Sequence, residues 1–121
     1  MIDRPNTVEA KTYRLKSAFT DKSIFITCGW VVKDDKKQPF EIFVNSKELT
    51  LNKEFVLITR LISAIFRRNG DVRFIIEELS SIHDPEGGRH KGNKFYSSMY
   101  SEIAEIIELF FDDIEYLREN K

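Results

Sequence analysis

A chain of 121 residues is long enough to bury a hydrophobic core as one domain without a metal ion or a disulfide. Its 41% hydrophobic content, with ten Phe, excludes a disordered chain. The 19 basic and 20 acidic residues give a net charge of −1, which argues against general binding to a nucleic-acid backbone.

The single cysteine, Cys28, lies inside an apolar run. One thiol forms no intramolecular disulfide, and two His do not complete a zinc site, so we expect a buried small hydrophobe in a reducing compartment. The N-terminus has no apolar signal segment and no stretch approaches the length of a membrane span. These features predict a cytoplasmic protein, in the host cytoplasm if it is viral, with no membrane partner.

The first half of the chain predicts strands. Residues 1–11 are expected to form an N-terminal arm, and residues 12–121 a single domain. Tyr13 and Leu15 alternate with polar residues, residues 23–32 are β-branched and aromatic, and residues 40–44 form a third apolar run. The polar turn over residues 34–37 connects the last two runs. We therefore expect an antiparallel meander with one covered face.

The second half has a helical period. Asn52 is expected to cap a helix that ends at Arg67 and Arg68, before Gly70. A short helix is expected from Asp71 through Leu79, and Ser97 or Ser98 is expected to cap a third one. The inward positions predicted for the three helices are, in order, Phe55, Ile58, Leu61, Ile62 and Ile65; Phe74, Ile75 and Leu79; and Met99, Ile103, Ile106, Ile107, Phe110, Ile114 and Leu117. The fold class is α+β, a three-stranded sheet carrying two to three helices.

Residues 84–96 are expected to form a thirteen-residue loop between two helices. The segment holds three glycines, several potential cations, two aromatic residues and an amide. Connections this long are usually functional or disordered. Glycines let backbone N–H groups approach a ligand, and the positive end of the following helix faces the loop, which suits an anion such as phosphate. The alternative is a mobile, solvated loop without a ligand.

Arg67 and Arg68 follow a helix whose inward face is already filled. They are either ordinary helix C-terminal charges or anion clamps, since a guanidinium matches phosphate bidentately. Arg60 lies two helical turns before Arg67 on the same side, so the two side chains are expected to line one groove.

No set of catalytic residues is apparent. His83 precedes the loop, and a lone His is more often a satisfied surface or core residue than a catalyst. The acids of the third helix are expected on a solvated face: Glu102, Glu105, Asp112, Asp113 and Glu119. No nucleophile, base and oxyanion hole come together, so the sequence predicts a protein that is not an enzyme and needs no cofactor or metal. Ten Phe exceed what one small core can hold, which favours a homo-oligomer.

Three separated blocks resemble a known family. They are Gln38–Lys47 (QPFEIFVNSK), Arg60–Val72 running on to Glu77–Leu79 (RLISAIFRRNGDV and EEL), and Asp84–Gly88 running on through Lys94–Phe95 to Glu102–Ile103. These blocks are similar to the TSCPD domain, found as the C-terminal accessory domain of adenosylcobalamin-dependent ribonucleotide reductases. The Thr-Ser-Cys-Pro-Asp stretch that names the family is replaced here by Ser97-Ser98-Met99-Tyr100-Ser101. The family cysteine, the reductase barrel and its redox pair are absent from this sequence, so the resemblance implies an accessory subunit or a domain reused alone.

In general layout the chain also resembles phage Thoeris anti-defence sponges, small non-enzymatic oligomers that sequester cyclic ADP-ribose or cyclic oligonucleotide signals. This resemblance implies a non-catalytic protein that binds a phosphate-bearing nucleotide, with aromatic rings for the base and cations for the phosphates. The alternative is an accessory subunit that docks onto a reductase; RNA binding is disfavoured by the charge balance. The candidate ligand-binding residues are Arg60, Arg67, Arg68, His83, Arg89, Lys91, Asn93, Lys94, Phe95 and Tyr96.

Overall fold

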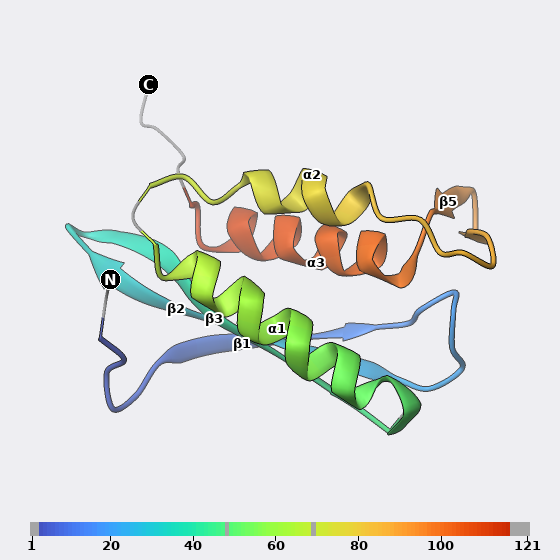
Figure 1. Ribbon diagram of the computed structural model, residues 1–121. Helices are drawn as coiled ribbons and strands as arrows, with labels where there is room; N and C mark the ends of the chain where they lie inside the picture. The colour runs from blue at the N-terminus through green and yellow to red at the C-terminus, as the bar shows by residue number, and fades with distance from the viewer. Residues whose placement is uncertain (1–2, 48, 69, 117–121) are drawn as a thin grey trace.

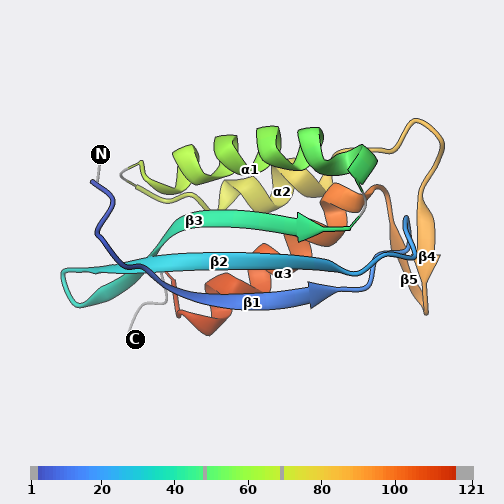
Figure 2. The ribbon, with the colours of Figure 1, turned by 90° about the horizontal axis from the view of Figure 1, so that it is seen from below.

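A computed structural model describes residues 3–47, 49–68 and 70–116 of the chain. The architecture is α+β, as predicted, with three strands followed by three helices and a small second sheet. Figures 1 and 2 show the three long strands in one layer, with all three helices on the same side of it.

The main sheet is the expected antiparallel meander, in the order β1-β2-β3. Its strands are β1 (Glu9–Leu15), β2 (Ile24–Lys33) and β3 (Lys36–Ser46). Asp34 and Asp35 form the predicted turn between β2 and β3, both with positive φ (54° and 63°), as a type I′ hairpin turn requires. Strand β1 begins at Glu9, so the last residues of the predicted arm belong to the sheet. They do so because they pair in register with β2, from Glu9 opposite Trp30 onward.

One face of the sheet carries the core. Ile24, Ile26 and Cys28 of β2 are fully buried beneath the helices, together with Ile42 of β3. Burial raises the pKa of the Cys28 thiol to about 12, so the thiol stays protonated and unreactive, in line with the predicted small hydrophobe.

Helix α1 (Asn52–Phe66) lies along the free edge of β3, as Figure 2 shows. Two predictions for it were wrong. Asn52 does not cap the helix, because the N-cap position falls on Leu51 and no side chain bonds there. Leu61 is exposed rather than inward, because the buried stripe runs through Phe55, Thr59, Ile62, Ser63 and Phe66. Two small polar residues thus occupy the inward face where the sequence suggested large aliphatic ones.

Ser63 explains why a polar residue belongs on that face. Its hydroxyl accepts a hydrogen bond from the Ile42 backbone N–H (3.0 Å) and donates one to the Ile42 carbonyl (3.2 Å). The serine therefore takes the place of a neighbouring strand and satisfies an edge that α1 would otherwise bury unpaired.

Helix α2 (Phe74–Ser80) is short and packs on α3 (Met99–Asp113). Ile75 and Leu79 are buried as expected, but Phe74 is exposed, because α2 begins only at this residue and turns it away from α3. Ser98 caps α3 with its side chain and forms a reciprocal capping box with Ser101, which confirms the predicted cap. Leu117, predicted inward, lies outside the described residues.

The C-terminal end of α3 is tied to the α1–α2 connection. Glu115 adopts positive φ (55°), and the Tyr116 N–H bonds the Phe111 carbonyl (2.9 Å), the pattern of a Schellman motif. The Tyr116 hydroxyl accepts from the Val72 N–H (3.0 Å) and donates to the Gly70 carbonyl (3.2 Å). One tyrosine thus joins two segments that are distant in the sequence.

The predicted thirteen-residue loop contains regular structure instead. Strands β4 (Arg89–Lys91) and β5 (Lys94–Tyr96) pair as an antiparallel hairpin. Gly92 has positive φ (64°) and Asn93 does not, as a type II′ turn requires. The Gly-Asn pair between two three-residue runs was the sequence signal for this hairpin.

Candidate functional site

The hairpin is fastened to α3 by two lysine–glutamate pairs. The Lys91 ammonium lies 3.4 Å from the Glu102 carboxylate and donates to the Lys16 carbonyl at 2.8 Å. One turn further along α3, Lys94 pairs with Glu105, whose other oxygen accepts from the Tyr96 hydroxyl at 2.9 Å. The hairpin therefore has a fixed position at one end of the molecule, to the right in Figure 1.

Glu102 was expected on a solvated face and is instead buried, at 1% exposure. Its carboxylate accepts hydrogen bonds from the Ser17 hydroxyl and from the Ala18 backbone N–H (2.8 Å), besides the Lys91 contact. The prediction was wrong because the β1–β2 connection and the hairpin cover the first turn of α3, and helical spacing alone does not show that cover. Glu119, predicted on the same face, lies outside the described residues.

The helix end that was expected to attract an anion is occupied by the chain's own groups. The Ser98 hydroxyl accepts from the Ser101 N–H, and Glu102 supplies a carboxylate in the first turn of α3. This end of the helix is thus satisfied internally and offers little to a phosphate.

Phe95 is displayed on the hairpin and is 53% exposed. A side chain at Gly88 would collide with it, since an added Cβ would lie 2.3 Å from the tip of the Phe95 ring. On another side His90 meets the ring edge-on, with the ring centroids 5.1 Å apart. The glycine and the imidazole thus hold the phenyl ring in place while most of its surface remains open.

Beside this ring lies a hollow of about 400 Å³, which we call the hairpin hollow. It is bounded by β5, the end of α2 and the first turns of α3. Its lining residues are Ile76, Ser80, His83, Lys94, Phe95, Tyr96, Ser97, Ser101, Glu105 and Glu108. The volume falls within the range of small-molecule sites, and the lining combines an aromatic ring with hydroxyls, carboxylates, an imidazole and an ammonium.

The Glu105 carboxylate, which lines the hairpin hollow, is ionised at neutral pH. Burial raises the pKa of Glu105, but the hydrogen bonds from Lys94 and Tyr96 together outweigh that effect and hold its pKa below the ordinary value. Glu105 therefore acts only as an acceptor, toward the hairpin and toward any donor that enters the hollow.

A second hollow, which we call the arginine groove, lies between α1 and the edge of β3. It has a volume of about 290 Å³ and is lined by Ile42, Phe43, Thr59, Arg60, Ser63, Ala64 and Arg67. Arg60 and Arg67 line it together, as predicted from their spacing. The Arg67 guanidinium also lies over the Phe40 ring (4.9 Å) and 3.7 Å from the buried Glu41 carboxylate, which Arg4 holds bidentately at 3.0 and 3.1 Å.

The ten candidate ligand-binding residues are thus divided. His83, Lys94, Phe95 and Tyr96 meet at the hairpin hollow, and Arg60 with Arg67 at the arginine groove. Arg68, Arg89, Lys91 and Asn93 line neither of these hollows. Tyr96, the last residue of β5, is buried, and the Arg89 guanidinium lies 5.8 Å from the centre of the Phe19 ring. Sequence reasoning missed Ser80, Ser97 and the two glutamates of the hairpin hollow, which have no distinctive spacing.

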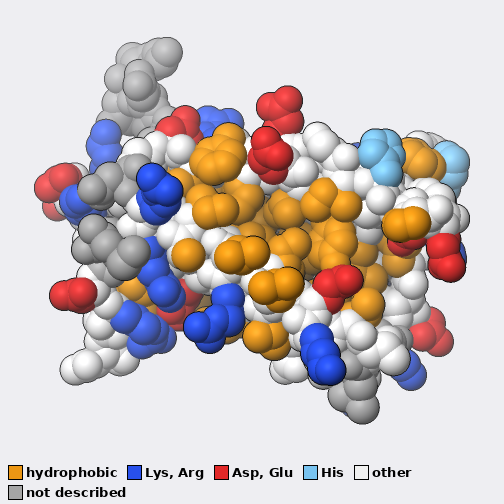
Figure 3. Space-filling view, in the orientation of Figure 1, with side chains coloured by type: hydrophobic (Ala, Val, Ile, Leu, Met, Phe, Trp, Pro, Cys, Tyr) orange, Lys and Arg blue, Asp and Glu red, His pale blue; other side chains and the backbone are white. Residues whose placement is uncertain are grey.

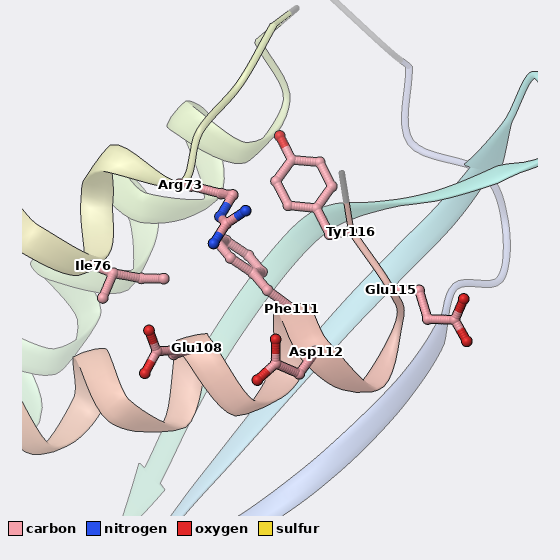
Figure 4. Close-up of a pocket in the computed structure, with 7 residues that line it drawn as sticks. All are labelled: Arg73, Ile76, Glu108, Phe111, Asp112, Glu115 and Tyr116. Carbon is pink, nitrogen blue, oxygen red and sulfur yellow. The ribbon is translucent and has the colours of Figure 1, made fainter. Parts of the chain in front are cut away.

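A third hollow, between α2 and the C-terminal half of α3, contains none of the candidate residues. Figure 4 shows the Arg73 guanidinium reaching across it toward the Glu108 and Asp112 carboxylates of α3. The mixture of charges gives this hollow no clear preference for an anion. Within the described part of the chain, no three metal-ligand side chains cluster, and no helix has the length and apolar character needed to cross a bilayer.

A family model for the TSCPD domain matches residues 3–111. The match covers most of the chain, so the protein belongs to the TSCPD domain family, as the three sequence blocks indicated. Comparison with curated proteins and with solved structures gave no significant match.

Proposed function

We propose that this TSCPD-domain protein is a non-catalytic nucleotide-binding protein, and that the hairpin hollow is its binding site. The observation that carries the proposal is the exposed Phe95 ring held beside a hollow that contains both hydrogen-bond donors and acceptors. An aromatic ring stacks on any nucleobase with a gain of about 1–3 kcal/mol. In the proposed complex the Glu105 and Glu108 carboxylates accept hydrogen bonds from ribose hydroxyls, and the His83 imidazole faces a polar edge of the nucleotide.

A phosphate group would be bound by Lys94. The Lys94–Glu105 pair is of the surface kind, with the two side chains 63% and 42% exposed. Such pairs contribute roughly 0–1 kcal/mol, so a ligand phosphate competes for the ammonium at little cost. Arg60 and Arg67 offer a separate anion site in the arginine groove, on a different part of the surface.

Binding without conversion is supported by two of the three serines that line the hairpin hollow, Ser97 and Ser101. The single proton of the Ser97 hydroxyl is directed to the carbonyl of Ile82 (2.9 Å) or of Ser80 (3.2 Å), and the Ser101 hydroxyl donates to the Ser98 carbonyl (2.6 Å). Their protons are committed to the backbone rather than to a base, so neither hydroxyl is activated as a nucleophile.

The biological role we propose is that of a phage anti-defence sponge, a homo-oligomer in the host cytoplasm. It would sequester a cyclic ADP-ribose-type or cyclic oligonucleotide signal and so inhibit Thoeris immunity. The support is the small size and layout of the chain, the presence of aromatic and cationic side chains in both hollows, and the resemblance to such sponges. The second candidate function, favoured by the TSCPD match, is an accessory subunit that docks onto an adenosylcobalamin-dependent ribonucleotide reductase.

The proposal is tested by thermal shift with ATP, dATP, ADP-ribose, cyclic ADP-ribose isomers and cyclic di- and trinucleotides. A true ligand stabilises the fold by RT ln(1 + [L]/Kd), about 4 kcal/mol at a thousandfold excess over Kd. The bound compound is then released by denaturation and identified. A large shift with the compound recovered unchanged supports a sponge; a chemically altered compound contradicts binding without catalysis. No shift across the panel removes the nucleotide site and favours docking onto a reductase.

A further inference from the structure

Helix α1 projects two leucines into solvent. Leu57 and Leu61 lie one helical turn apart and are 62% and 58% exposed. Their exposure follows from the buried stripe through Phe55, Ile62 and Phe66, which lies on the other side of the helix. A pair of large aliphatic side chains on a helix surface is a common mark of an interface.

Next to this ridge is an apolar furrow between α1 and α2. The two helices make few direct contacts, since α2 packs on α3 and α1 packs on β3. Figure 3 shows apolar side chains gathered over this face, with the surface hollowed between the helices. The apolar residues that border the furrow on α1 and α2 are Ile58, Leu61, Ile65 and Phe74.

Contacts within the chain place these residues. The Tyr100 hydroxyl, in the first turn of α3, donates to Glu54 of α1. Ile58 and Leu61 follow Glu54 on the same flank of α1, so this flank faces the other helices. On α2, Ile76 lines the hollows that contain Glu108, away from α1, so the opposite flank with Phe74 and Glu78 borders the furrow.

The two rims of this face carry opposite charges. On the α1 side, beyond the leucine ridge, lies Arg60. On the α2 side lie Glu78, which borders the furrow, and Glu77 beyond it, both exposed. A twofold axis parallel to the helices, between ridge and furrow, would bring the basic rim of one copy against the acidic rim of the other.

We propose that a second copy of this chain covers this face, forming a twofold dimer in which the Leu57–Leu61 ridge of each protomer fills the α1–α2 furrow of its partner. Ridge and furrow lie side by side, so one patch serves both protomers, as a closed isologous interface requires. The arrangement also pairs Arg60 with Glu77 or Glu78 across the interface. It names the surface of the homo-oligomer in the proposed function and leaves the hairpin hollow open.

The dimer is tested by sedimentation velocity without nucleotide, so its failure is distinct from a failure of nucleotide binding. The wild-type protein is expected at twice the 14.2 kDa of one chain. Leu61→Glu is expected to weaken association at least about tenfold, because it places a charge in the partner's furrow. The matched control is Val32→Glu, at a site 63% exposed on β2, which should dimerise as the wild type does.

A charge exchange keeps the proposal falsifiable if Leu61→Glu folds poorly. Arg60→Glu and Glu78→Arg should each weaken the dimer, and the two together should restore it. The proposal is overturned if the wild type is monomeric at submillimolar concentration, if Leu61→Glu and Val32→Glu behave alike, or if the double exchange is no better than the single variants.

Discussion

Two phenylalanine rings are exposed to nearly the same degree in two different hollows. Phe95 is 53% exposed at the hairpin hollow and Phe43 is 52% exposed at the arginine groove. Around Phe95 stand carboxylates, hydroxyls, an imidazole and one ammonium, whereas around Phe43 stand two guanidiniums and two hydroxyls. The mixed donors and acceptors suit a ribose-bearing ligand, whereas the groove, whose charged lining residues are both arginines, suits a simpler anion.

The two regions also differ in how their shape is maintained. The arginine groove is built on the main sheet and α1, which share the hydrophobic core. The shape of the hairpin hollow depends on polar contacts between α3 and the small sheet of β4 and β5. Aromatic exposure alone therefore does not identify a ligand site; the supporting contacts decide which chemistry the ring serves.

The largest expected effect comes from removing the buried Glu102 carboxylate, which should destabilise the region of the hairpin hollow more than that of the arginine groove. Glu102→Ala leaves the Ser17 hydroxyl and the Ala18 N–H without their acceptor and leaves the Lys91 ammonium with only the Lys16 carbonyl. Each of the two donors left without a partner costs about 1–3 kcal/mol, and the charge of Lys91, whose side chain is 37% exposed, adds less than a buried charge would. Thermal unfolding should show the loss, and amide exchange should show the hairpin amides exposed before those of β2. The matched variant Glu108→Ala, on an exposed turn of the same helix, should unfold close to the wild type. Equal stability of the two variants would contradict the role given to Glu102.

The arginine groove has its own structural test, with a smaller expected effect. Ser63→Ala leaves the Ile42 N–H and carbonyl buried without a partner, at a cost of about 1–3 kcal/mol. Denaturant unfolding measures the loss. Ser81→Ala removes an exposed hydroxyl that bonds the Glu77 carbonyl at the end of α2, and it serves as the control. The interpretation of Ser63 as a substitute strand is wrong if both serines tolerate the change equally.

The smallest effect concerns pH. The folded-state pKa of Glu105 lies below its ordinary value, because the effect of burial is outweighed by the hydrogen bonds from Lys94 and Tyr96. Its contribution is therefore fully present above that value and is lost as the pH falls through the folded-state pKa. The difference in melting temperature between the wild type and Glu105→Gln should be constant near neutral pH and should vanish in acid. A difference that persists unchanged in acid would show that the charge of Glu105 does not fasten the hairpin.

The structure also changes the choice of variant at the arginine groove. Arg67→Glu is the direct charge reversal, but it would place a second carboxylate beside the buried Glu41 and lower stability by repulsion. Arg60→Gln removes a cation from the same groove without this conflict.

Much of the fold was predictable from the sequence because local pattern and tertiary structure agree there. The alternating strands, the Asp34-Asp35 turn, the Ser98 cap and the Arg60–Arg67 groove follow from short-range spacing. Failures arose where distant segments decide the outcome. Glu102 is buried by the β1–β2 connection and the hairpin. Ser63 occupies an inward position on α1, where an aliphatic residue was expected, because its hydroxyl satisfies the edge of β3. Neither the burial of Glu102 nor the role of Ser63 can be predicted from the periodicity of the sequence.

The candidate site was predictable in composition but not in arrangement. The cations and aromatic residues between His83 and Tyr96 were identified, yet three of them serve the hairpin itself. Lys91 bonds Glu102, Lys94 pairs with Glu105, and Tyr96 is buried. The sequence does not show which acidic side chain a lysine or arginine pairs with, so these ion pairs become visible only in the structure.

The central claim, that nucleotide is bound in the hairpin hollow, is tested most directly by titration calorimetry on two matched variants. The ligand is the nucleotide that gives the largest thermal shift. Phe95→Ala should weaken its binding about 5- to 150-fold, the equivalent of a stacking contribution of about 1–3 kcal/mol, while Phe43→Ala should bind as the wild type does. A larger loss in Phe43→Ala, or unchanged binding in both variants, would contradict the account.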